Sequence, residues 1–177
     1  MDKTKVTAEE MARGLSMFCK KFSKHLYENF GVKAQGILGV KLDEAQLVTL
    51  AREIWIINLW IISKVLSPDK KVLGELHKIY LFSQEKTANM EYGKANFPKE
   101  AEKELHERYE KYYDAWDNNS GGNQSVLAMT MLEYMLNKGQ PDKRFTNFLL
   151  ISEINSHMLG MMKAVLDFRK DFEITNQ

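Results

Sequence analysis

Cysteine, proline and an excess of charge of either sign are the scarce features of this sequence. Its 177 residues include one cysteine and three prolines, and 25 lysines and arginines nearly balance 24 aspartates and glutamates. A single cysteine excludes a disulfide within the chain and is typical of proteins in a reducing compartment. The balanced charge, without any basic block, argues against a nucleic-acid partner.

Long apolar runs are scarce as well. The N-terminal residues are charged and lack the apolar core of a signal peptide. The longest apolar stretch, around 54–62, is too short and too closely flanked by charge to predict a membrane span. The sequence therefore predicts a cytoplasmic protein without a membrane partner.

Helical periodicity is what the chain has instead. The stretch 43–66 begins at Asp43, a good N-cap residue, and stops before Pro68. Apolar residues cover most of its circumference, which is typical of a helix in the middle of a bundle. Other helices carry similar signals, including the capping pair Thr7 and Glu10 and a glycine stop at Gly31. The expected helices cover about 7–30, 43–66, 69–92, 98–116, 124–137 and 143–172.

Short connections join most of these helices and place consecutive ones antiparallel. The expected fold class is therefore all-α, an up-and-down bundle of about six helices in a single domain. The glycine-containing segment 31–42 is expected to be a partly buried connection. The last residues of the chain are expected to fray.

A bulky apolar pair on the polar side of the central helix is the first candidate site. Ile56 and Trp60 share a stripe with Arg52 when residues are placed at about 100° per step. Tryptophan and arginine are over-represented among interface anchors, so the sequence predicts a partner-binding patch of Ile56, Trp60 and Arg52. On this hypothesis Trp60→Glu dissociates an oligomer and leaves the helices intact. The alternative is that segment 31–42 covers the pair within the monomer.

Asn58 is the second candidate, because it lies near the centre of the apolar arc, where an amide needs hydrogen-bond partners. The favoured interpretation is a buried hydrogen bond that fixes helix register. The alternative is a polar group that orients a small ligand in an apolar cavity. Methionines concentrate in the last two helices and suit such a cavity, although they more often fill a core. The candidate ligand-binding residues are Asn58, Met158, Met161 and Met162.

Metal and catalytic sites are only weakly indicated. The chain has no Glu-x-x-His pair, and the nearest pairs are Glu102 with His106 and Glu153 with His157. Acid–base chemistry is one interpretation of a polar cluster on the fourth helix. The alternative is that the tyrosine rings pack at the edge of the core and their hydroxyls face solvent. We therefore assign no catalytic residue, no metal and no cofactor. The cluster consists of Glu102, His106, Tyr109 and Tyr113.

The leading functional hypothesis is a cytoplasmic, non-catalytic helical interaction module that forms a homodimer or binds another protein. A bundle that binds a small apolar ligand in a methionine-rich cavity is the alternative. A metal or acid–base enzyme is the third hypothesis.

Overall fold

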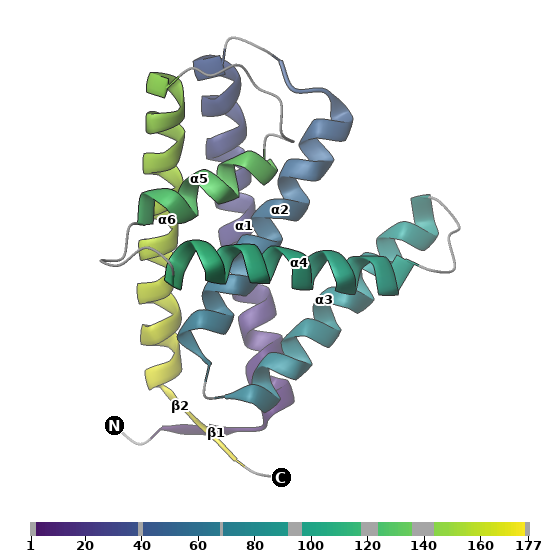
Figure 1. Cartoon of the computed structure of the whole chain (residues 1–177). Coiled ribbons are helices and arrows are strands. Elements are labelled where there is room, and N and C mark those ends of the chain that lie inside the picture. Colours follow the sequence, from purple (N-terminus) through teal and green to yellow (C-terminus); the bar gives the residue numbers. More distant parts are fainter. Residues whose placement is uncertain are drawn as a thin grey trace.

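Six helices and one short pair of strands make up the structure, a computed structural model that describes residues 3–38, 41–67, 69–91, 97–117, 124–135 and 144–175 (Figure 1). The expected all-α bundle in a single domain is confirmed. The elements in chain order are β1 (Thr4–Val6), α1 (Ala8–Leu38), α2 (Glu44–Val65), α3 (Lys70–Glu91), α4 (Phe97–Asp117), α5 (Gln124–Met135), α6 (Arg144–Lys170) and β2 (Phe172–Ile174).

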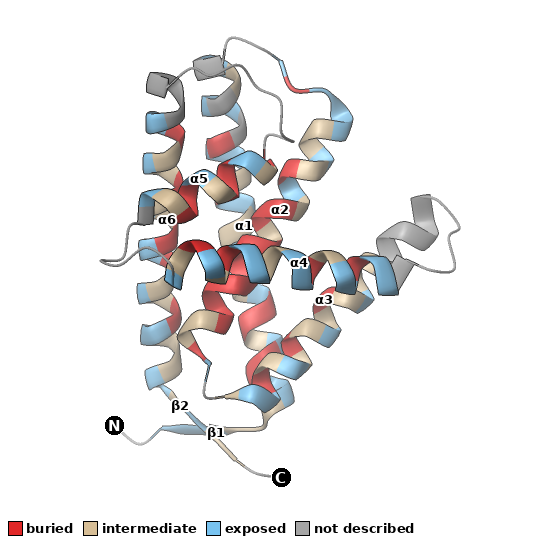
Figure 2. Cartoon of the chain, viewed as in Figure 1, coloured by how far each residue is buried: buried red, intermediate tan, exposed pale blue. Residues whose placement is uncertain are grey.

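The long helices alternate in direction, and α2 lies among them. In Figure 1, α1 and α2 run antiparallel, α3 turns back again, and α6 descends beside α1, while α4 crosses in front of α2 and α3. Helix α2 contacts α1, α4, α5 and α6. Buried residues accordingly run along nearly all of its central turns (Figure 2). The prediction that 43–66 is the central helix is confirmed.

Local side-chain chemistry sets where two of the helices begin. At the start of α2, Asp43 Oδ1 accepts a hydrogen bond from the Gln46 backbone N–H at 2.8 Å, and Gln46 Oε1 accepts one from the Asp43 N–H at 2.9 Å. Thr7 and Glu10 form the same reciprocal pair ahead of α1. Such a box satisfies two backbone donors that have no partner within the helix.

Two predictions about chain ends and helix ends are wrong. Helix α1 does not stop at Gly31 but continues to Leu38, because one glycine weakens a helix by only about 1 kcal/mol relative to alanine. The prediction that the last residues fray is wrong for those in β2, which pairs in parallel with β1 in the register Thr4 with Phe172. Residues 176 and 177 lie outside the described residues. Residues 39 and 40 of the expected connection lie outside the described residues. The other helix ends differ from the predicted ones by at most two residues.

Helix α2 is long and apolar enough to cross a membrane by length and composition alone, so the sequence argument from its length is wrong. Burial distinguishes a membrane span from a core helix better than length does. Of the most apolar 18-residue window of α2, 56% lies inside the bundle. That is the pattern of a core helix in a globular protein.

Candidate functional site

Two of the three α2 residues that were predicted to bind a partner lie inside the molecule. Ile56 and Trp60 are fully buried, so the prediction that they form an exposed patch is wrong. The aromatic face of α4 covers Trp60, whose ring centre lies 5.6 to 6.0 Å from those of Tyr112, Tyr113 and Trp116. The rings that pack on Trp60 thus come from α4.

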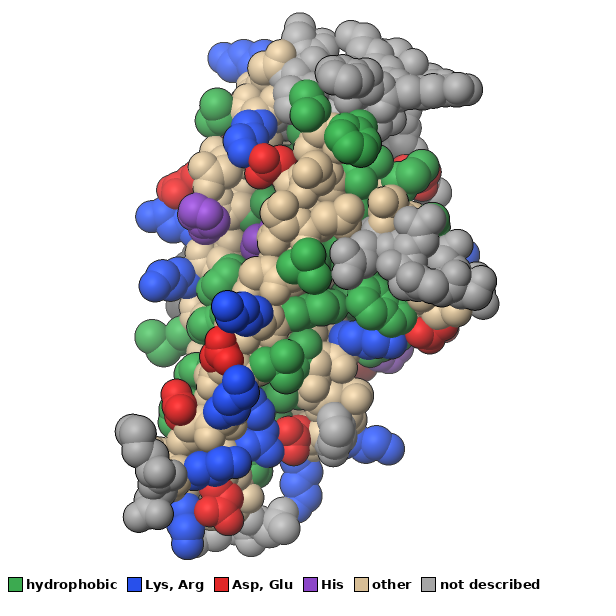
Figure 3. Space-filling view, turned by 90° about the vertical axis from the view of Figure 1, so that its left-hand side faces the viewer, with side chains coloured by type: hydrophobic (Ala, Val, Ile, Leu, Met, Phe, Trp, Pro, Cys, Tyr) green, Lys and Arg blue, Asp and Glu red, His purple; other side chains and the backbone are tan. Residues whose placement is uncertain are grey.

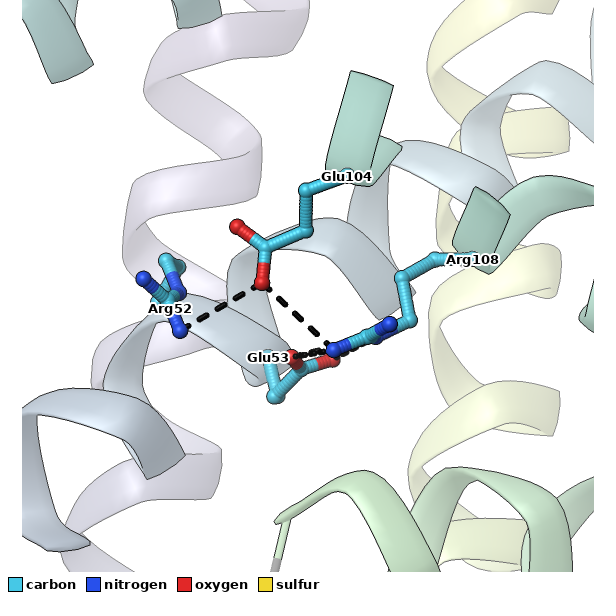
Figure 4. Close-up of polar contacts among 4 residues, drawn as sticks. All are labelled: Arg52, Glu53, Glu104 and Arg108. Carbon is cyan, nitrogen blue, oxygen red and sulfur yellow. Dashed lines mark hydrogen bonds and ion pairs between the residues drawn. The ribbon is translucent and has the colours of Figure 1, made fainter. Parts of the chain in front are cut away.

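Arg52, the third residue of the predicted patch, belongs to a cluster of four charged residues between α2 and α4 (Figure 4). Arg108 donates from Nε and Nη2 to the Glu53 carboxylate over 3.0 to 3.2 Å. Glu104 pairs with Arg108 at 3.4 Å and with Arg52 at 3.3 Å. The cluster holds two positive and two negative charges, so α4 docks on α2 without leaving a net charge in the interface.

Glu53 is the most deeply buried member of this charged cluster, with 1% of its side chain exposed. Burial raises its pKa, and the hydrogen bonds from Arg108 oppose that rise. Arg108 is itself held in place, because its guanidinium carbon lies 3.7 Å from the centre of the Tyr134 ring on α5. The Glu53–Arg108 pair therefore ties three helices together.

Asn58 has hydrogen-bond partners on two other helices. Its Nδ2 donates to Ser23 Oγ of α1 at 2.9 Å, and its Oδ1 accepts from Nε2–H of His157 on α6 at 2.6 Å. Burial lowers the pKa of His157 to about 4, so the ring is neutral at pH 7. Both ends of the amide are thus engaged, as in the favoured register interpretation.

Replacing Asn58 with alanine is expected to destabilise the protein by about 1–3 kcal/mol, because Ser23 and His157 then lose their buried partner. Chemical denaturation followed by circular dichroism measures the change. Asn155→Ala is the matched control, since the Asn155 side-chain oxygen has no hydrogen-bond partner within the described part of the chain. Equal stability of Asn58→Ala and the wild type would contradict a register role.

Two of the three methionines of the ligand hypothesis fill the core. Met158 is 2% exposed and Met161 is fully buried, whereas Met162 is half-buried. The amide of Asn58, which was to orient a ligand, is already satisfied by protein groups. These contacts favour packing over a ligand cavity for this part of the bundle.

The polar cluster predicted on α4 divides between the interior and the surface. The Tyr109 hydroxyl lies 3.0 Å from His77 Nε2 on α3 and 3.2 Å from Ser63 Oγ on α2. Burial raises the pKa of Tyr109 well above its ordinary value and lowers that of His77, so both groups are neutral at pH 7. His106, by contrast, is exposed. The sequence did not indicate Ser63 and His77 as partners of Tyr109, because they lie on other helices.

The two glutamate–histidine pairs do not converge on a metal site. His157 bonds to Asn58, while Glu153 pairs with Lys33 of α1. Among the residues that the structure describes, no group of three or more histidine, cysteine or acidic side chains lies close enough to hold a metal ion.

An exposed apolar row on α6 is the remaining candidate for an interaction site. Leu159 and Leu166 are 51% and 50% exposed, and Phe148 is 64% exposed. Leu159, the half-buried Met162 and Leu166 follow one stripe of the helix at spacings of three and four. Figure 3, which faces α6, shows hydrophobic side chains gathered over the middle of this side.

No family model matches the chain, and neither a curated protein nor a solved structure matches it.

Proposed function

We propose that this protein is a non-catalytic helical interaction module of the cytoplasm that associates with a second copy of itself through α6. The observation that carries the proposal is the half-exposure of Leu159 and Leu166 on one stripe of that helix. Single exposed leucines are normal on protein surfaces. A row of large apolar side chains along one helix face is instead typical of an interaction site.

The spacing of the row favours a second copy as the partner. A two-fold symmetric interface uses the same patch on both subunits, so the patch must be complementary to itself. Leu159 and Leu166 lie symmetrically about the point between Met162 and Lys163. When two α6 helices pack antiparallel about that point, Leu159 faces Leu166 of the second copy and two Met162 side chains fill the centre.

Charge substitutions at the two leucines test this arrangement. Leu159→Lys and Leu166→Glu are each expected to convert a dimer to a monomer, because each places an unpaired charge opposite a leucine. In the antiparallel pair the double variant places lysine opposite glutamate, so it should recover dimer. Two α6 helices packed in parallel would instead place like charges opposite each other, so the double variant would not recover the dimer. Analytical ultracentrifugation measures the species present.

Phe82→Lys is the matched control, because Phe82 is 69% exposed and lies on α3. It should leave the association unchanged, and circular dichroism should show native helix content for every variant. A wild type that stays monomeric at the highest accessible concentration would refute the proposal.

A further inference from the structure

A hollow of about 430 Å³ runs along the surface of α4, separate from the α6 row. Its lining residues follow the helix at spacings of three, four, seven and eight, so they form one continuous stripe. The stripe combines aromatic rings with acidic side chains. These residues are His106, Tyr109, Glu110, Tyr113 and Asp114.

Two tyrosine rings form the aromatic part of the hollow. The ring centres of Tyr109 and Tyr113 lie 6.4 Å apart in an edge-to-face arrangement. The Tyr109 hydroxyl bonds with His77 and Ser63. These two contacts hold the Tyr109 ring in place. Because they already engage its hydroxyl, the ring face is the part of Tyr109 that can contact a ligand. Fixed aromatic faces attract cations through the negative charge density above the ring.

The neighbouring surface already holds an ammonium group in this way. Lys64 Nζ lies 5.1 Å from the centre of the Tyr113 ring and 5.3 Å from that of Trp116. Its counter-ion is the carboxylate of Asp117, 3.4 Å away. Rings combined with a carboxylate therefore bind a primary ammonium at the C-terminal end of α4. The hollow places the same two kinds of group one turn earlier, with Glu110 and Asp114 as the acids.

We propose that the hollow along α4 binds a primary organic ammonium group, of the kind carried by an alkylamine or a lysine side chain. The ammonium lies against the rings of Tyr109 and Tyr113, and the carboxylates of Glu110 and Asp114 accept its hydrogen bonds. The alkyl part of the ligand covers the rest of the aromatic surface. Among the residues that the structure describes, the lining of this site comes from α4.

Titration with n-butylammonium, followed by nuclear magnetic resonance of the tyrosine ring signals, tests the site. Saturable shifts of the Tyr109 and Tyr113 signals are expected, and n-butanol, a neutral analogue of the same length, should not produce them. Glu110→Gln combined with Asp114→Asn should weaken binding about tenfold, because both counter-charges are lost. Tyr113→Phe should bind like the wild type, whereas Tyr113→Leu should bind more weakly.

Controls on the same helix separate a site from general charge attraction. Glu102→Gln combined with Glu107→Gln removes the same number of charges from residues that do not line this hollow. It should leave the affinity nearly unchanged. Lys64→Met should tighten binding, because it frees the Tyr113 ring, and Lys111→Met, with the same charge change, should not. An absence of saturation, or equal loss in the two acidic double variants, would overturn the proposal.

Discussion

Replacing Trp60 with alanine is expected to destabilise the protein by about 3–5 kcal/mol, the range for removing a large aromatic side chain from a core. Trp60 is fully buried and packs on Tyr112, Tyr113 and Trp116 of α4. Its removal leaves a cavity between α2 and α4 and also ends three ring–ring contacts. Chemical denaturation followed by circular dichroism measures the loss.

Two further variants distinguish this core role from the interface role expected from the sequence. Phe82→Ala removes another large ring, but Phe82 is 69% exposed, so its effect should stay within about 0.5 kcal/mol. Trp60→Glu should unfold the protein rather than yield a smaller folded species, because it places a carboxylate without a partner in the core. A folded, stable and smaller Trp60→Glu species would instead support the interface role.

The error about Trp60 has a specific physical cause. Helical periodicity sorts residues by polarity around one helix, but it does not show which other helix lies against each face. Arg52 and Glu53 marked one stripe of α2 as solvent-facing, yet their partners are Glu104 and Arg108 of α4. A complementary signal was present in the sequence, because α4 carries its own aromatic stripe with opposite charges beside it.

Other parts of the fold followed from the sequence because their causes are local. Asp43 and Thr7 mark helix starts through contacts within a few residues, and such contacts are visible in sequence order. The pairing of β1 with β2 joins the two ends of the chain, so no local pattern indicates it. Likewise, Asn58 could be identified as a buried amide, but its partners Ser23 and His157 could not.

The apolar row on α6 was missed for a related reason. In the sequence of α6, Ile151, Ile154 and Val165 mark one apolar side, and Ser156 and Lys163 mark a polar side. Leu159 and Leu166 lie between those two sides, and only packing decides whether such boundary positions are covered. In this fold both remain about half exposed.

Arg108→Met is expected to be as damaging as the loss of Trp60, at about 3–5 kcal/mol near pH 7, because it leaves the charge of Glu53 buried without its partner. Burial already raises the pKa of Glu53, and Arg108 opposes that rise. Without the arginine, the pKa in the folded state rises further. A carboxyl with a raised pKa favours folding at low pH and loses that contribution as the pH rises through the folded-state pKa.

The deficit of Arg108→Met relative to the wild type should therefore shrink as the pH falls toward the ordinary glutamate pKa of 4.5, where Glu53 becomes neutral. Adding Glu53→Leu should restore most of the stability at pH 7, since an apolar pair replaces a buried ion pair at little cost. Lys103→Met removes a positive charge from the exposed side of α4 and should have little effect. Unfolding free energies of these variants, measured between pH 7 and the ordinary glutamate pKa of 4.5, test whether the charge of Glu53 causes the deficit. A deficit that is independent of pH, or no rescue in the double variant, would mean that Arg108 acts through its packing on Tyr134 rather than through the charge of Glu53.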